Sequence, residues 1–595
     1  MGEGKKVFYL FVLLILLAFL GIFLSKRDIR VWFSDLYADY TAYFYISDDF
    51  FLKEDYVYYP EEGKFKMLYR VWRVPLVYNE ELNKPFIRLD GVDSDKTVYL
   101  KDWRGEVHLL EGIKEREIVK REAERNEVGI VKLDKFTGKR ETLSISYYVY
   151  PPVNDDGNYQ HINIKLGDKH IFYKSVILNV FDEAGIVEYV YPHFPYFRIE
   201  RKGNIWKIEG KAPADTLLEL EVLMKGLEGM HFYTEAASVK RKVEKENETL
   251  IHYMNLRNSA YDFMYISLLL FPFVYLLIYR LFGKEAKFTV PKFISFVPNS
   301  KRKPWIVNMI FSGDATVTDE NAYYSTLLDL ERRGFIKIIE EGDDVRIRVL
   351  RMDTDDKYER KILIFLTANT DKEGFFSVRN MEDKVKEAIR FKDRKVLENL
   401  KRQVDGIYRF SDRGIYSGVL DLKGFYLMRM IGGLTFISVL GVIIYLSLFK
   451  YIYIYDIVVM GSFLIAVANI PHILLPSQIL GRWKSDLYKE RLEWEAFKRF
   501  LSDLAMLEKY GKEDLSLWKE WIYYGTALGV AENIEKVMSS LKINVPEIRK
   551  VSYIRRRDYL FYKSLKEGIK SFSSGSGKGG FGVGSGFGGG GAGGR

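Results

Sequence analysis

Four long apolar stretches constrain this chain more than any other feature of its sequence. They lie at Val7–Leu24, Phe263–Phe282, Met430–Phe449 and Ile457–Leu475. Each is close to the ~20 residues that an α-helix needs to cross the hydrocarbon core of a bilayer. A water-soluble protein can bury one such helix, but four in one chain predict an integral membrane protein. The lipid bilayer is therefore its first predicted partner.

Positive charges flank these stretches on one predicted side of the membrane. Lys5 and Lys6 precede the first stretch, and Arg280 and Lys284 lie at the end of the second and just after it. The flanks of the third and fourth stretches agree, with Lys423, Arg429, Arg482 and Lys484. Lys and Arg near membrane helices mark the cytoplasmic side. The pattern predicts a multi-pass protein of the cell membrane with both termini in the cytoplasm and residues 27–258 outside.

The net charge of the chain follows the same division. Residues 27–258 hold roughly 35 basic and 40 acidic side chains, a net charge of about −5. The whole chain carries +9, so the remainder carries about +14. Because this excess falls on the predicted cytoplasmic side, the basic pI needs no nucleic-acid partner to explain it.

The predicted domain organisation starts from a membrane anchor. No small-x-small cleavage motif ends the first stretch, so an uncleaved signal anchor is favoured over a cleaved signal peptide. The full division is as follows: 1–26 signal anchor with a transmembrane helix at 7–24, 27–258 extracytoplasmic β-rich domain, 261–282 transmembrane helix, 283–425 cytoplasmic winged-helix-like α+β domain, 427–475 transmembrane hairpin (430–449 and 457–475), 476–570 cytoplasmic helical module, 571–595 Gly-rich disordered tail.

Residues 27–258 have the pattern of an all-β, sandwich-like domain. Short runs rich in aromatic and β-branched residues alternate between apolar and polar side chains and end at Gly, Asp or Pro, as at 142–150 and 217–223. The chain has no cysteine, which excludes disulfides and thiolate metal sites. Missing cysteine together with abundant Lys and Glu is also typical of an archaeal or thermophile source.

Nothing in the same region has the spacing of a catalytic or metal site. Six of the seven histidines lie here without a His-Glu-x-x-His or His-x-x-x-His motif: His108, His161, His170, His193, His231 and His252. The sequence therefore predicts no catalytic residue, no metal and no cofactor. Asn247-Glu-Thr249 is a possible glycosylation site on the predicted outer side.

The predicted cytoplasmic part contains a helix followed by a β-hairpin. Asp319–Gly334 has helix capping signals at both ends, and Phe335–Glu341 and Val345–Leu350 read as paired strands. This order resembles the back half of a winged helix. The helix carries Tyr323 and Leu327 where a DNA reader needs basic or polar side chains, so a packing or protein-contact module is favoured over DNA binding.

Two features near the end of the chain are candidate contact sites for proteins. A predicted helix after Asp514 carries aromatic side chains and two glycines one turn apart, a possible interaction surface: Trp518, Trp521, Tyr524, Gly525 and Gly529. Residues 571–595 are mostly Gly and predict a disordered tail. Phe581 and Phe587 are possible contact points within it.

These features resemble the DUF2207 proteins, predicted membrane proteins of unknown function in bacteria and archaea. The resemblance rests on the stretch from Asn321 to Ile338 with its "LLDLERRGFIKI" run, on the Trp494–Leu504 and Leu517–Val530 segments, and on the Gly-rich tail. Gly525 stands where Ala is more usual. The resemblance implies a membrane anchor, an outer β domain, a cytoplasmic domain and a membrane hairpin. It implies no catalytic residues.

Together these observations predict a non-catalytic scaffold or sensor with protein partners on both sides of the membrane. The first alternative is an envelope enzyme, or a subunit of an envelope-processing complex, using paired acids such as Asp155-Asp156. The second alternative is a membrane-tethered winged-helix regulator. The sequence leaves the oligomeric state open.

Overall fold

The computed structural model describes residues 3–229, 232–341, 344–448, 452–510, 514–543, 546–573 and 593–595. The chain forms two compact units. The β-rich unit contains residues 12–272, 434–467 and 583–595. The helical unit contains residues 1–11, 273–433 and 468–582.

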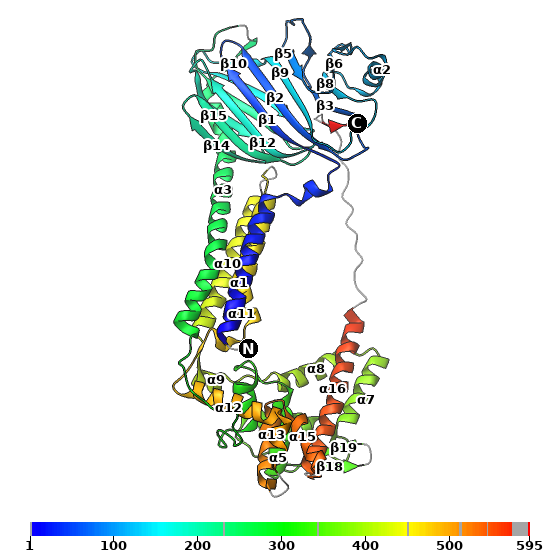
Figure 1. Cartoon of the computed structure of the whole chain (residues 1–595), viewed down its shortest axis with the longest axis vertical. Coiled ribbons are helices and arrows are strands. Elements are labelled where there is room, and N and C mark those ends of the chain that lie inside the picture. The colour runs from blue at the N-terminus through cyan, green and yellow to red at the C-terminus, as the bar shows by residue number, and fades with distance from the viewer. Residues whose placement is uncertain are drawn as a thin grey trace. The chain divides into compact units, whose positions relative to one another are not determined.

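Three sheets build the β-rich unit (Figure 1). The first has eight strands in the order β14 (Tyr196–Lys202), β15 (Ile205–Ala212), β12 (Phe172–Asp182), β1 (Leu36–Ile46), β2 (Phe50–Pro60), β9 (Glu141–Tyr150), β5 (Phe86–Asp93), β4 (Leu76–Val77). The second has five, in the order β13 (Val187–His193), β16 (Leu218–Met224), β11 (Gln160–Gly167), β10 (Pro152–Asp155), β17 (Phe232–Glu235). The third has five, in the order β23 (Gly593–Gly594), β3 (Met67–Val71), β8 (Glu127–Val131), β6 (Thr97–Lys101), β7 (Val107–His108).

The first and second sheets share one hydrophobic core. Along β1 every second side chain is buried, including Tyr40 and Phe44, as a half-buried strand requires. These side chains belong to the same cluster as Val190 and Val222 of the second sheet, so the two sheets pack face to face. The predicted β-rich character of the N-terminal region is confirmed, although residues 239–258 of the predicted domain belong to a helix. The stretch 113–122, between β7 and β8, forms the helix α2 (Ile113–Glu122).

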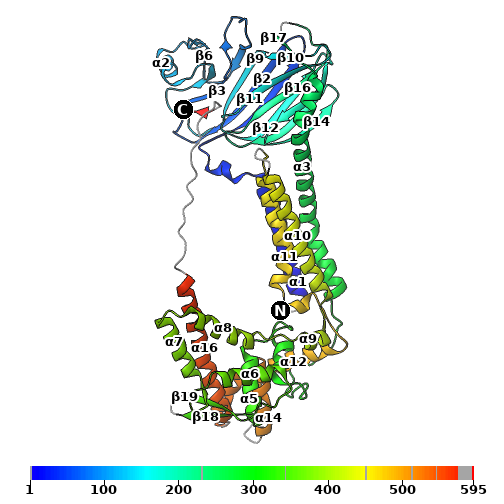
Figure 2. The ribbon, with the colours of Figure 1, turned by 180° about the vertical axis from the view of Figure 1, so that it is seen from behind.

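Among the described residues, four helices are long and apolar enough to cross a membrane, as predicted: α1 (Glu3–Lys26), α3 (Val239–Ile278), α10 (Lys423–Ser447) and α11 (Tyr455–Leu474). α3 begins well before the predicted start at residue 261 and is one unbroken helix (Figure 2). Its first turns pack Val239 and Val243 against Tyr191 and Leu223 of the second sheet. The helix therefore begins on the β-rich domain and continues into the apolar stretch.

The helical unit contains the predicted helix and hairpin as α5 (Glu320–Arg332), β18 (Ile336–Glu341) and β19 (Asp344–Val349). Every side chain from Ala322 to Leu330 is buried, so this helix presents no free face to a DNA groove. Side chains from 305–422 and 483–565 share one core, so the predicted α+β domain and helical module are packed together. The winged-helix assignment stays a prediction.

Candidate functional site

The end of the described chain lies in the β-rich unit as a short strand added to a sheet edge. β23 pairs antiparallel with β3, with Gly593 opposite Tyr69 and Gly594 opposite Leu68. Arg595 N donates to Met67 O at 3.1 Å, and Arg595 O accepts from the amides of Lys66 and Met67 at 2.5 and 2.9 Å. The predicted disorder of 571–595 is therefore wrong for these three residues, and also for 571–573, which end a helix. For residues 593–595, pairing with a sheet edge supplies the order that their composition cannot.

Both glycines are required by the space available beside β3. A Cβ on Gly593 would lie 2.5 Å from the hydroxyl of Tyr69. A Cβ on Gly594 would lie 2.5 Å from Phe65 Cδ1 and 2.8 Å from Leu36 Cδ2. All three distances are well inside van der Waals contact, so a larger residue at either position would have to displace these side chains or leave the strand.

Four groups hold the Arg595 side chain. Its Nη2 donates to Glu124 Oε1 at 2.6 Å. Its Nη1 donates to Glu127 Oε2 at 3.3 Å and to the carbonyl of Glu122. The guanidinium lies over the ring of Tyr69, 4.6 Å from its centroid. Such a planar cation between carboxylates and an aromatic face is a typical arginine pocket. We call residues 65–69 with Glu124 and Glu127 the Gly-Gly-Arg site.

Glu127 is the buried acid of this site, with 0% of its surface exposed. Its Oε1 accepts from the Tyr99 hydroxyl at 2.6 Å and its Oε2 from the amide of Glu124 at 2.9 Å. Burial raises the pKa of Glu127, and the hydrogen bonds from Tyr99 and Glu124 and the charge of Arg595 offset part of that rise. Arg595 is the only cation paired with this carboxylate among the described residues.

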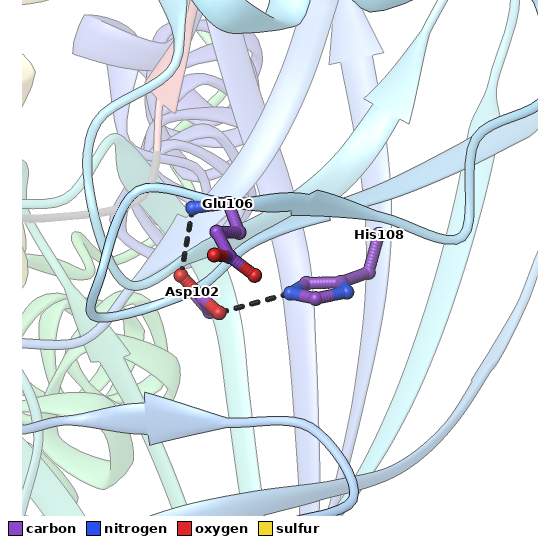
Figure 3. Close-up of side chains that lie close together, drawn as sticks. All are labelled: Asp102, Glu106 and His108. Atoms are coloured by element: carbon purple, nitrogen blue, oxygen red, sulfur yellow. Dashed lines mark hydrogen bonds and ion pairs between the residues drawn. The ribbon is translucent and has the colours of Figure 1, made fainter.

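A second acidic group lies at the turn between β6 and β7 (Figure 3). Asp102, Glu106 and His108 place one ligand atom each within 4.8 Å of one another. Asp102 Oδ1 accepts from the amides of Arg104, Gly105 and Glu106 at 2.8–2.9 Å, and Oδ2 lies 2.9 Å from His108 Nε2. Because both oxygens of Asp102 are already bonded, this group is explained as the framework of a turn.

The β-rich unit also has an open pocket of about 360 Å³ beside Trp72 and Phe86. Its lining is mostly apolar, with the basic side chains of Arg70, Arg73 and Lys165. Asp168 is the one acid among the described residues that line it. The pocket therefore lacks the pair of carboxylates that an acid–base hydrolase would need.

The residues predicted as an interaction surface lie inside the helical unit. Trp518 and Trp521 are completely buried and Tyr524 nearly so, in the core shared with α5. Gly525 faces Ile534 Cδ1 within the same unit, and Gly529 ends α14 (Leu515–Ala527) with a φ of +75°. These positions are therefore core and a helix end, and not a free surface. Phe581 and Phe587 lie outside the described residues.

Asn247, the possible glycosylation site, is also completely buried. Its Nδ2, the atom to which a glycan would attach, donates to Glu221 Oε2 and to Val243 O, both at 2.9 Å. A glycan could not be attached there in the folded unit.

Sequence reasoning missed the Gly-Gly-Arg site because its two halves lie at opposite ends of the chain. The one available signal was a charged residue closing a run of glycines.

Some solved structures have a weak likeness to the chain. The chain is similar to a crystal structure of an M1 zinc metallopeptidase from Deinococcus radiodurans at 8% identity, covering 32% of this chain and 42% of that chain, with a TM-score of 0.19. A two-domain mutant of an M1 zinc metallopeptidase bound to L-tryptophan gives 7% identity, 32% and 43% coverage and the same TM-score. The chain thus spans less than half of either structure. A TM-score this low carries no argument about fold or activity.

Comparison with protein families is more informative. No curated protein matches the chain. The N-terminal domain of DUF2207, described as a predicted membrane protein, matches residues 38–224. The C-terminal domain of the same family matches residues 290–538. The chain therefore belongs to the DUF2207 family of predicted membrane proteins.

Proposed function

We propose that this protein is a non-catalytic membrane scaffold or sensor whose β-rich unit binds an extended Gly-Gly-Arg segment of a partner protein. The observation that carries the proposal is the strand formed by residues 593–595 on β3. Strand addition to a sheet edge is a general way to bind peptides: backbone hydrogen bonds supply affinity and side-chain pockets supply selectivity. In this role the helical unit would contact proteins on the other side of the membrane.

The recognised sequence follows from the contacts. The Tyr69 hydroxyl and the Phe65 ring leave no room for side chains at the first two positions, which selects Gly-Gly. Glu127 is buried and needs a cation, and the flat guanidinium of Arg also stacks on Tyr69. Loss of one partner from a buried charge pair costs about 2–5 kcal/mol, so the arginine should dominate binding.

The order of helices along the chain indicates that the bound segment belongs to another protein. α3, α10 and α11 separate the β-rich strands from residue 593. If all three cross the bilayer, the odd number of crossings puts the chain's own Gly-Gly-Arg on the side opposite the β-rich domain. We therefore assign the site to a segment of another protein, and take residues 593–595 to reproduce its chemistry.

Peptide binding to the full-length protein in lipid nanodiscs tests this proposal. The probe is a fluorescent peptide with the sequence of residues 588–595. We expect saturable binding that weakens at least about 30-fold when the final Arg of the peptide becomes Ala. Glu127→Gln in the protein should cause a similar loss, and Glu124→Gln, at a more exposed position, a smaller one. Equal binding of the Arg and Ala peptides would overturn the proposal.

A shortened protein separates the two possible occupants. A variant that lacks residues 593–595 should bind the peptide in nanodiscs as tightly as the full chain, because with three bilayer crossings the chain's own segment would be kept away from the site. If only the shortened variant binds the peptide, the chain's own segment fills the site. That result would overturn the assignment to a partner.

A further inference from the structure

A second buried acid in the β-rich unit faces two histidines. Glu221 lies on β16, with His161 on the neighbouring β11 and His193 on the other neighbour, β13. His161 Nε2 lies 3.3 Å from Glu221 Oε2, and His193 Nε2 lies 3.4 Å from Glu221 Oε1. Glu219 is two residues along β16, and His193, Glu219 and Glu221 place one ligand atom each within 4.8 Å of one another. We call these four residues the His–Glu cluster.

The strand pairing explains how distant residues meet here. Glu219 pairs directly with His193, and Glu221 pairs with Asn163, two residues after His161. Side chains two apart on a strand share a face, so all four residues point from the same face of the second sheet. Sequence spacing could not show this, because the two histidines are on strands that do not pair with each other.

Two nitrogens of the cluster are buried without a hydrogen bond. Neither His161 Nε2 nor His193 Nε2 has a partner of hydrogen-bonding geometry among the described residues, although both atoms are closed off from solvent. Buried polar atoms are normally bonded, and an exception calls for a physical explanation. The side chains of His161 and His193 are 12% and 23% exposed, which leaves a route from solvent to the cluster.

The spacing of these atoms fits a shared metal ion. Two ligands bound about 2.0–2.1 Å from a tetrahedral zinc ion lie about 3.3–3.4 Å apart. The 3.4 Å between His193 Nε2 and Glu221 Oε1 matches that spacing, and Glu219 belongs to the same close group. His161 Nε2 lies 3.3 Å from the other oxygen of Glu221, beside that group. Imidazole nitrogen with carboxylate oxygen is a ligand set that zinc accepts.

The carboxylates of the cluster are also held in place by amides. Asn163 Nδ2 donates to Glu219 Oε1, and Asn247 Nδ2, on α3, donates to Glu221 Oε2, each at 2.9 Å. Metal-binding carboxylates are characteristically oriented by such outer hydrogen bonds. Asn247 also brings the start of α3 to the cluster.

We propose that His193, Glu219 and Glu221 bind one divalent transition-metal ion of the zinc class, with His161 against the second oxygen of Glu221. The ion would tie β13 to β16 at the point where α3 begins. In this domain, which has no cysteine, the ion provides a structural cross-link.

Zinc titration of the chelator-treated full-length protein tests the site. We expect calorimetry to show one zinc ion per chain. In the double variant His161→Ala/His193→Ala, zinc affinity should fall by more than the 10–100-fold that changes outside the ligand shell typically cost. His108→Ala is the matched control, because His108 is already bonded to Asp102, and it should bind zinc like the unchanged protein. Cobalt should give the visible absorption of a tetrahedral site, and Glu221→Gln should reduce it.

Peptide binding at the Gly-Gly-Arg site shows whether the double variant is folded. A variant that keeps peptide binding and loses zinc supports the proposal. Zinc binding that is equally tight in the double variant, or absent from the unchanged protein, overturns it.

Discussion

Glu127 in the β-rich unit and Asp558 in the helical unit are both buried carboxylates, but they meet different neighbours. Glu127 faces the guanidinium of Arg595. Asp558, on α16 (Pro546–Ser573), accepts from the Tyr408 hydroxyl at 3.1 Å. Burial, with a smaller contribution from Glu382, raises the pKa of Asp558 to about 7. One buried acid therefore depends on a cation, while the other is accommodated as a neutral group near pH 7.

The different neighbours of these acids show that burial of a carboxylate does not by itself mark a binding site. Glu54, in the same unit as Glu127, is also buried, but its partner Arg70 lies 3.2 Å away, on β3 of the third sheet, and is itself buried. That pair is part of the permanent core. The cation at Glu127 comes instead from a three-residue segment held by one strand edge, which is why we propose this site, and not the Glu54 site, for a partner segment.

A double-mutant cycle should give the largest effect. It combines Glu127→Gln in the protein with Arg→Ala in the peptide. Because both changes remove the same charge pair, we expect a coupling free energy of about 1.5–5 kcal/mol from the four dissociation constants. Glu221→Gln is the control and should show no coupling to the peptide. Additive losses would show that the two charges do not interact.

Asp558→Asn should stabilise the protein, whereas Glu127→Gln should weaken peptide binding. The folded-state pKa of about 7 lies above the unfolded value near 3.8, so the folded protein retains the proton longer. Asp558 then costs no stability below about pH 4 and lowers it as the pH rises toward 7. At 1.4 kcal/mol per pKa unit, the loss between pH 5 and pH 8 is about 2–3 kcal/mol. Thermal unfolding at the two pH values should show that Asp558→Asn removes most of this loss.

Gly594→Val in the peptide tests the steric part of the site. A side chain at this position would overlap Phe65 and Leu36, and overpacking of this kind costs about 1–3 kcal/mol. We expect binding to weaken by roughly 5- to 150-fold with the arginine contact intact. Restoration of binding in a Phe65→Ala protein would sharpen the assignment, and unchanged binding of the Val peptide would contradict it.

The affinity for the peptide should fall in acid. The pKa of Glu127 lies above its usual value, and protonation removes the charge that pairs with arginine. Binding should be strongest above that pKa and weaken by up to about tenfold per pH unit below it. Fluorescence titrations between pH 8 and pH 4.5 measure this. The Arg→Ala peptide is the control, and its residual binding should show a flatter profile.

Gly525→Ala should give the smallest effect. Replacement of a helical Gly by Ala gains about 1 kcal/mol of helix propensity. The new methyl would displace only Ile534 Cδ1, the end of a flexible side chain. We expect a change in unfolding free energy within about 1 kcal/mol and no change in peptide binding. A large loss would indicate a rigid packing contact in place of an adjustable one.

Much of the architecture was predictable because its signals are local. Apolar runs of bilayer length, alternating strand patterns and the capped helix at 319–334 are each set by neighbours in the chain. The start of α3 was not predictable, because its first turns are polar in composition and only contact with Tyr191 and Leu223 defines their buried face. Trp518 and Trp521 were misplaced for the same reason, since an aromatic helix face serves equally as core or as surface.

By itself, the sequence determined the family, the membrane-spanning helices and the β-rich character of the first domain. These depend on composition and periodicity, which act over a few residues. Only the tertiary structure brought Arg595 to Glu127 and set His161 and His193 around Glu221. Both arrangements depend on strand pairing between distant segments, and the free energy of a buried charge depends on which partner that pairing supplies.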